Sequence, residues 1–187
     1  KQKLKKKRHK LYLMDKENYR INDPIIRKLR HQIVRKGDSD FQKAMAIYKY
    51  LINNIEYYRD DKWEPAPDIL KNRKGSCSEF NYTLVSLLRA SGIPARYTGS
   101  LSIRQQDVTE YDGNIHEDAV FHRWTEVFTP DYGWIPFDAS RGSGSIKRFG
   151  NYYDLVGRLP SGALQTYRGD GGADNMLKWD YTATARS

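Results

Sequence analysis

Residues 74–96 of the chain read KGSCSEFNYTLVSLLRASGIPAR, and this stretch contains one complete apolar helix with its start and stop signals. Gly75-Ser76 interrupts the chain ahead of the helix, and Ser91-Gly92 ends it. The apolar side chains between these signals recur at helical spacing and are Phe80, Leu84, Leu87 and Leu88. We therefore predict that residues from Ser78 to Ala90 form the central buried helix of the fold.

Cys77 is the single cysteine of the chain, and it opens this helix. At that position the sulfur lies at the positive end of the helix dipole, which lowers a thiol pKa and favours the thiolate. The backbone N–H groups of the first turn can also hydrogen-bond the oxyanion of a tetrahedral intermediate. A buried and inert cysteine is the alternative, and position alone does not separate the two.

Downstream of the helix the period of the apolar pattern changes from helical to alternating, which indicates strands. The alternation runs from Ala95 to Ile103, and residues 105–118 are polar and typical of a loop. Further strands are predicted from Val120 to Phe128 and from Trp134 to Asp138. The residues between them, 129–133, read TPDYG and form a compact turn, so we expect these two strands to make a hairpin.

The hairpin places an imidazole and a carboxylate on one face. If Phe128 lies beside Trp134, His122 faces position 140 and Asp138 becomes its diagonal neighbour, within side-chain reach. Such a pair fixes which ring nitrogen carries the proton and supports a cationic histidine next to a thiolate. A histidine beside an aspartate on a strand is by itself more often structural, but a cysteine at a helix start favours a catalytic interpretation.

Upstream of the central helix the sequence predicts two further helices. One begins at Asn22-Asp23-Pro24 and continues to Val34, and Gly37-Asp38-Ser39 then ends it and caps a second helix over residues 40–55. A turn-rich segment over 59–67 and a short helical patch near 69–71 follow. From Arg141 onward Gly, Ser and aromatic residues predict long loops with one or two more strands. Helices packed on an antiparallel sheet give an α+β fold.

The excess positive charge is confined to the start of the chain. Residues 1–10 hold six lysines and one arginine, whereas the remaining residues hold 25 basic and 23 acidic side chains. We interpret residues 1–10 as a solvated linker, although such a run can also bind an anionic polymer or surface, or nucleic acid. No run of apolar residues is long enough for a membrane span. The chain begins with Lys, which indicates a trimmed or processed product, and an extracytoplasmic location is favoured over a cytoplasmic one.

Three blocks of the sequence resemble the signatures of the transglutaminase-like superfamily. The first is the stretch over 74–96, the second is HRWTEVF over 122–128, and the third is GWIPFD over 133–138. The order Cys, His, Asp also agrees, with separations of 45 and 16 residues. The resemblance, which spans about residues 40–141, implies a papain-type core in which Cys77 is the nucleophile, His122 the general base and acid, and Asp138 the residue that orients His122.

Other site residues are less sharply defined by the resemblance. It implies an upstream side-chain donor to the oxyanion, for which the candidates are Tyr57, Tyr58 and Trp63. Trp124 is expected to pack the sheet or to wall the cleft, and Glu79 to make a local hydrogen bond at the helix start. A zinc site of His116, Glu117, Asp118 and His122 is an alternative for that segment, but it has no recognised ligand spacing.

These observations predict thiol-dependent acyl transfer on amide bonds through a thioester at Cys77. Hydrolysis of a peptide, protein or other amide substrate is favoured, without a cofactor or metal, and amine transfer and a non-catalytic peptide- or polymer-binding module are the alternatives. We expect a basic tail and helical arm over 1–37, a catalytic core over 38–141 and a Gly- and aromatic-rich extension, packed on the core, over 142–187.

Overall fold

The computed structural model describes residues 1–59, 62–102, 121–143, 150–158 and 163–169. The chain has an α+β fold in which most helices precede the main sheet. The helices are α1 (Lys6–Leu11), α2 (Pro24–Ile33), α3 (Asp40–Asn54), α4 (Ala66–Asn72) and α5 (Cys77–Ala90). The strands are β1 (Glu56–Tyr57), β2 (Lys74–Gly75), β3 (Ala95–Ser102), β4 (Phe121–Thr129), β5 (Gly133–Phe137) and β6 (Ala163–Gly169). No helix in these ranges is long and apolar enough to span a membrane.

The main sheet has the order β5-β4-β3-β6, and all of its strand pairs are antiparallel. The predicted hairpin register is confirmed, since Phe128 pairs with Trp134 and Thr125 with Phe137. The turn over 130–133 ends at Gly133, whose φ of 77° lies in the left-handed region that favours glycine. This register brings the start of β4 next to the residues that follow β5.

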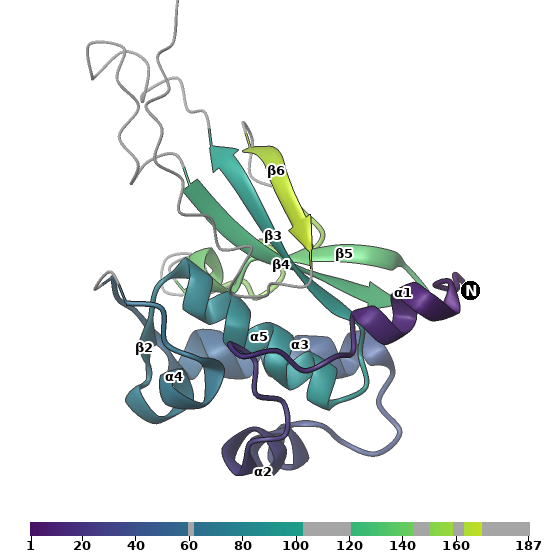
Figure 1. Cartoon of the computed structure of the whole chain (residues 1–187), viewed down its shortest axis with the longest axis horizontal. Helices are drawn as coiled ribbons and strands as arrows, with labels where there is room; N and C mark the ends of the chain where they lie inside the picture. The colour runs from purple at the N-terminus through teal and green to yellow at the C-terminus, as the bar shows by residue number, and fades with distance from the viewer. Residues whose placement is uncertain (60–61, 103–120, 144–149, 159–162, 170–187) are drawn as a thin grey trace, which may run out of the picture.

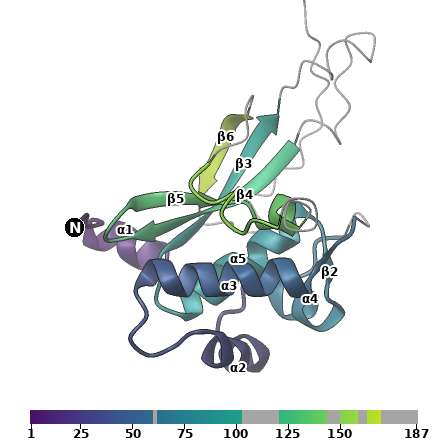
Figure 2. The same ribbon diagram turned by 180° about the vertical axis from the view of Figure 1, so that it is seen from behind.

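Helix α5 is the central element of the core, as predicted, and it lies against the sheet beside α3, with α2 farther from the sheet (Figure 1 and Figure 2). It contacts α2, α3, α4, β3 and β4. Every side chain from Ser78 to Arg89 is buried, so the helix is enclosed on all sides rather than on one stripe. Its first residue is Cys77, and therefore the packing of α5 determines where the sulfur lies.

The predicted upstream helices are confirmed together with their caps. The Asp23 side chain accepts a hydrogen bond from the N–H of Ile25 at the start of α2, where Pro24 is the first residue. Ser39 and Gln42 form a capping box at the start of α3. α4 is longer than the predicted patch because it begins at Ala66, with Pro67 in its first turn.

The N-terminal segment differs from the predicted linker. Residues Lys6–Leu11 are helical, and the N–H of Gln2 donates to the carbonyl of Pro130 at the β4–β5 turn (2.6 Å). Tyr12 packs edge-on against Trp134 at 5.0 Å between ring centroids. The charged side chains are exposed where the structure describes them, so the segment is solvated as predicted. Gln2 and Tyr12 nevertheless attach it to the β4–β5 hairpin.

One other feature was not predicted. β1 and β2 form a short parallel pair, with Glu56 opposite Lys74 and Tyr57 opposite Gly75. The predicted loop over 105–118 lies outside the described residues, and of the predicted C-terminal strands the structure describes β6, which pairs with β3. The short pair is important for the site because it places the residues after β1 next to the start of α5.

The enclosure of α5 leads to a stability prediction. Leu84→Ala should lower the free energy of unfolding by about 2–5 kcal/mol, because it leaves a cavity at a fully buried position. Leu11→Ala is the matched control, since Leu11 is 37% exposed and its loss should cost less than about 0.5 kcal/mol. Urea unfolding followed by circular dichroism measures both. Equal effects of the two substitutions would contradict the central position of α5.

Candidate active site

Cys77 is the first residue of α5 and is partly exposed as a residue. The Glu79 carboxylate holds two parts of the chain that precede Cys77. One carboxylate oxygen accepts from the N–H of Ser76 (2.7 Å), and the other accepts from the N–H of Glu64 (2.9 Å). The expected local hydrogen-bonding role of Glu79 is therefore confirmed. The buried carboxylate anchors the segment before α4 to the first turn of α5, so the start of the helix cannot shift independently.

His122 and Asp138 are in direct contact on the opposite element. Nε2 of His122, near the start of β4, donates to Oδ2 of Asp138 across 2.5 Å, and both side chains are buried. Asp138 follows the last residue of β5, where the hairpin register makes it the diagonal neighbour of His122. The short distance is typical of a charge-assisted hydrogen bond. The juxtaposition of ring and carboxylate that the register predicts is thus present.

Asp138 is held from all sides. Its second oxygen, Oδ1, accepts from the Ser140 hydroxyl (3.2 Å) and from the Arg141 N–H (3.1 Å), so it caps the helical turn over residues 139–143. The backbone N–H of Asp138 donates to the carbonyl of Leu155 (3.1 Å), and the backbone carbonyl of Asp138 accepts from the Tyr48 hydroxyl (3.5 Å). The carboxylate is therefore oriented before any substrate arrives.

Buried polar contacts also join α5 to β4, which carries the histidine, and to the neighbouring strand β3. The Asn81 amide donates to the carbonyl of Cys77 (2.7 Å), and its oxygen accepts from the Thr125 hydroxyl on β4 (2.6 Å). The Tyr97 hydroxyl on β3 donates to the Ser78 hydroxyl (3.2 Å). These contacts were not predicted from the sequence. Asn81 could have indicated them, because it is a polar residue within the apolar helix and lies one turn after the cysteine.

The pKa of the Cys77 thiol is lowered. Burial opposes this by raising the pKa, but a hydrogen bond to His122 and the positive charges of Arg123 and His122 outweigh it. The pKa of His122 is raised to about 9, because the attraction of Asp138 and the hydrogen bonds to Asp138 and Cys77 outweigh the lowering effect of burial. The two shifts have opposite directions and favour a thiolate–imidazolium pair at neutral pH.

The remaining sequence candidates lie in two different environments. Tyr57, Tyr58 and Trp63 are exposed by 48–50% and belong to the segment that precedes α4. The Tyr58 N–H donates to the carbonyl of Gly75, and the Tyr57 ring lies 6.5 Å from the Phe80 ring, so this segment borders the start of α5. Trp124 is instead buried, with its ring centroid 6.3 Å from that of His122. It packs beside the imidazole, and the structure does not present it to solvent.

The zinc alternative cannot be placed in full. His116, Glu117 and Asp118 lie outside the described residues, and the fourth proposed ligand, His122, is engaged with Asp138. Within the described ranges no cluster of three or more histidine, cysteine and acidic side chains has the geometry of a metal site.

Comparison with known proteins identifies relatives of the chain. Residues 27–139, more than half of the chain, match the model of the transglutaminase-like superfamily. The uncharacterized protein YebA of Bacillus subtilis is 30% identical over 128 residues, which cover 63% of this chain and 17% of YebA. An uncharacterized protein of Haemophilus influenzae is 26% identical over 136 residues, covering 63% of this chain and 36% of that protein. The chain thus spans only a minor part of the length of these relatives.

Two solved structures share the fold. A candidate cysteine protease from Cytophaga hutchinsonii superimposes with a TM-score of 0.67 at 22% identity, covering 98% of this chain and 54% of that one. The periplasmic domain of TgpA from Pseudomonas aeruginosa superimposes with a TM-score of 0.55 at 17% identity, covering 80% of this chain and 52% of that one. At these identities the likeness concerns the architecture.

The opposite pKa shifts of Cys77 and His122 predict how the reactivity of the thiol depends on pH. Alkylation of Cys77 by iodoacetamide should begin below the pH at which an ordinary thiol ionises, and the ion pair should persist up to about pH 9, where His122 loses its proton. His122→Ala should move the thiol midpoint upward, because burial and the Asp138 charge, which raise the thiol pKa, would then be opposed only by the Arg123 charge. His31→Ala, which removes an exposed histidine, is the control. An unchanged midpoint in His122→Ala would refute the pairing.

Gly142 lies in the helical turn that Asp138 caps, and we predict that substitutions of Gly142 and Tyr48 have coupled effects on stability. A methyl group at Gly142 would collide with the Tyr48 hydroxyl and lie 3.0 Å from its ring carbon Cζ, in a buried region. Gly142→Ala should therefore lower the free energy of unfolding by about 1–3 kcal/mol. In the Gly142→Ala/Tyr48→Phe double variant part of this loss should be recovered, because the colliding oxygen is absent. Urea unfolding of the four proteins tests this, and additive losses would contradict it.

Proposed function

Because this chain belongs to the transglutaminase-like superfamily, we propose that it is a thiol enzyme that cleaves amide bonds through an acyl-enzyme at Cys77. The observation that carries the proposal is the arrangement at the start of α5. Cys77, a partly exposed residue whose thiol pKa is lowered, begins a helix, and its thiol is hydrogen-bonded to an imidazole that a buried carboxylate holds. Purely structural cysteines do not need such a charged neighbour.

The first half of the reaction transfers the acyl group. The Cys77 thiolate attacks the carbonyl carbon of the amide, and the carbonyl oxygen becomes an oxyanion. The protonated ring of His122 then gives its proton to the amide nitrogen, so that the carbon–nitrogen bond breaks and the amine leaves. A thioester remains on Cys77, and His122 is left neutral, with Asp138 still holding Nε2.

The second half returns the enzyme to its starting state. Neutral His122 accepts a proton from a water molecule, whose oxygen attacks the thioester carbon. The second tetrahedral intermediate collapses, the carbon–sulfur bond breaks, and the carboxylic acid product leaves. The thiolate and the imidazolium are thereby restored. An amine in place of water would give a new amide by the same steps, so the same acyl-enzyme supports both outcomes.

Stabilisation of the oxyanion is assigned to the backbone N–H of Cys77 and to one donor from the segment after β1. That N–H belongs to the first turn of α5, where backbone donors lack partners within the helix. Tyr57, Tyr58 and Trp63 remain the candidates for the second donor. They are exposed, and the contacts of Gly75 with Tyr58 and of Glu79 with Glu64 tie their segment to the nucleophile.

We favour hydrolysis over amine transfer because Cys77 is a partly exposed residue, which is compatible with access of water to the thioester. A binding module without catalysis is the other alternative, and it is disfavoured by the charged state that the pair adopts, since a module of this kind gains nothing from a thiolate. The extracytoplasmic location expected from the sequence stays a prediction, as does the substrate.

The acyl-enzyme can be detected directly. Incubation with a library of peptide amides should add an acyl mass to the intact protein, and the adduct should be discharged by water and by hydroxylamine. Cys77→Ala should show no adduct and no amide cleavage, because no other sulfur is present in the chain that could form this thioester.

An added primary amine separates the two fates of the acyl group. Release of free acid in its presence indicates hydrolysis, whereas incorporation of the amine indicates transfer. Cys77→Ser, which keeps the size of the side chain but has a far less acidic nucleophile, is the matched control for folding. Full activity in Cys77→Ala, or a wild-type protein that acquires no adduct while it binds peptide amides, would overturn the proposal.

A further inference from the structure

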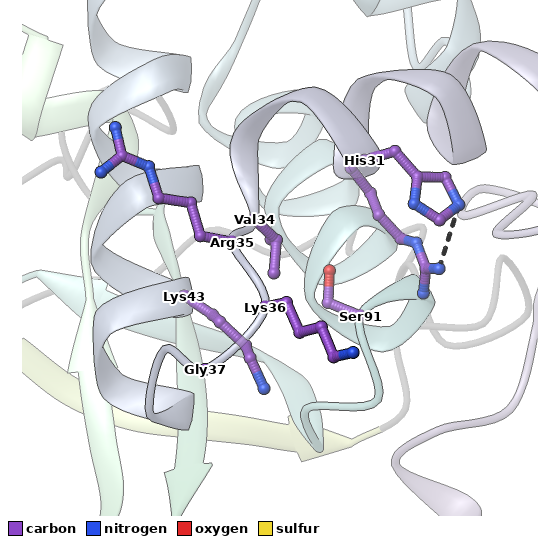
Figure 3. Close-up of a pocket in the computed structure, with 8 residues that line it drawn as sticks. His31, Val34, Arg35, Lys36, Gly37, Lys43 and Ser91 are labelled. Atoms are coloured by element: carbon purple, nitrogen blue, oxygen red, sulfur yellow. Dashed lines mark hydrogen bonds between the residues drawn. The ribbon is translucent and has the colours of Figure 1, made fainter.

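A pocket lies far from the cysteine, at the other end of α5. It has a volume of about 320 Å³ and is formed by the end of α2, the α2–α3 connection, the first turn of α3 and Ser91 after α5 (Figure 3). We name it the α2–α3 pocket. α5 has 14 residues, so about 20 Å separates its two ends. A ligand in the α2–α3 pocket would therefore not touch Cys77.

The lining of the α2–α3 pocket is strongly basic. Its eight lining residues include four cations and a histidine and no acid: Arg30, His31, Val34, Arg35, Lys36, Gly37, Lys43 and Ser91. Residues 27–43 contain six Lys and Arg against two Asp, although the chain after residue 10 is nearly balanced. The excess charge outside the N-terminal run is thus concentrated around this pocket.

The nearby acids do not neutralise the pocket. Asp38 accepts a hydrogen bond from the backbone N–H of Arg35 (3.4 Å), and Asp40 pairs with Lys43 (3.4 Å). The two nearby carboxylates therefore compensate only part of the positive charge of the four cationic side chains. Figure 3 shows Lys36 and Lys43 extending in the same direction past Gly37, whereas Arg35 points away from them. Like charges that share a small space repel one another, and an anion between them would relieve that repulsion.

Helix electrostatics explain only part of this arrangement. Cations are favourable at helix C-termini, and Arg30 is used in this way, since it donates to the Ala90 carbonyl at the end of α5 (2.5 Å). Lys43 has the opposite position, because it lies in the first turn of the 15-residue helix α3, where a cation opposes the dipole. An anion in the pocket would interact favourably with Lys43 and with the positive end of α3.

We propose that the α2–α3 pocket binds a phosphate group. Its volume is in the range of small-ligand sites. Its cationic side chains can supply charge-assisted hydrogen bonds to a phosphate. One of them, Arg30, is already positioned by the Ala90 carbonyl and by its contact with His31. Free phosphate and the phosphate of a lipid headgroup share this chemistry. The proposal does not depend on the catalytic activity of Cys77.

The test is titration with inorganic phosphate in chloride buffer at constant ionic strength, followed by amide chemical shifts in the NMR spectrum. Wild-type protein should show saturable shifts at the residues around the pocket. Lys36→Gln/Lys43→Gln should weaken binding by more than about tenfold, because two charge-assisted contacts are lost. Lys10→Gln/Lys71→Gln is the control, since it removes the same charge from exposed positions outside residues 27–43 and outside the pocket.

A second arm distinguishes the two sources of phosphate. Cosedimentation with phosphatidylglycerol vesicles, compared with phosphatidylcholine vesicles, identifies a headgroup if the pocket variant loses binding and the control variant keeps it. Binding of inorganic phosphate without vesicle binding identifies a free phosphate ligand. The proposal is overturned by shifts that do not saturate, or by equal weakening in the two double variants, which would indicate general charge attraction. Unchanged thermal unfolding of both variants without phosphate shows that neither loss reflects misfolding.

Discussion

The hydrogen bond between His122 and Asp138 is the contact on which the site depends, and the fold provides it through strand pairing. A shift of one residue in the β4–β5 pairing would turn one partner to the opposite face of the sheet. The register is maintained by the turn at Gly133 and by the packing of Phe128 against Trp134. The position of the carboxylate therefore follows from ordinary hairpin geometry, without backbone strain at the reacting groups.

The second requirement is that the helix carrying the sulfur keeps a constant position relative to that hairpin. Apolar packing alone permits small rotations of a helix, whereas hydrogen bonds within the core are directional. Asn81 bonds to both the first turn of α5 and Thr125 on β4, so it relates the nucleophile to the strand of the histidine. At the far end of β4 the buried pair of Arg96 and Glu126, joined at 2.6 Å, makes a comparable link between β3 and β4.

Local sequence signals were sufficient for the elements that build this site. Apolar periodicity and caps identified α2, α3 and α5, and alternation with turn residues identified the β4–β5 hairpin and its register. The β1–β2 pair was missed because two-residue strands contain no periodicity. The contact of Asn81 with Thr125 was missed because it joins residues 44 positions apart, and nothing in either segment specifies the other. Helix α1 was missed because its charge pattern equally describes a solvated run.

The two oxygens of Asp138 have separate partners, and this limits what can replace it. One oxygen caps the turn over 139–143, and the other faces the ring of His122. Asparagine has nearly the same shape, but only one of its terminal atoms accepts hydrogen bonds. In either orientation its NH₂ group would meet another donor, the Arg141 N–H or the Nε2–H of the imidazolium. The backbone cap and the imidazolium together thus select for an anionic side chain here, because each needs its own acceptor oxygen.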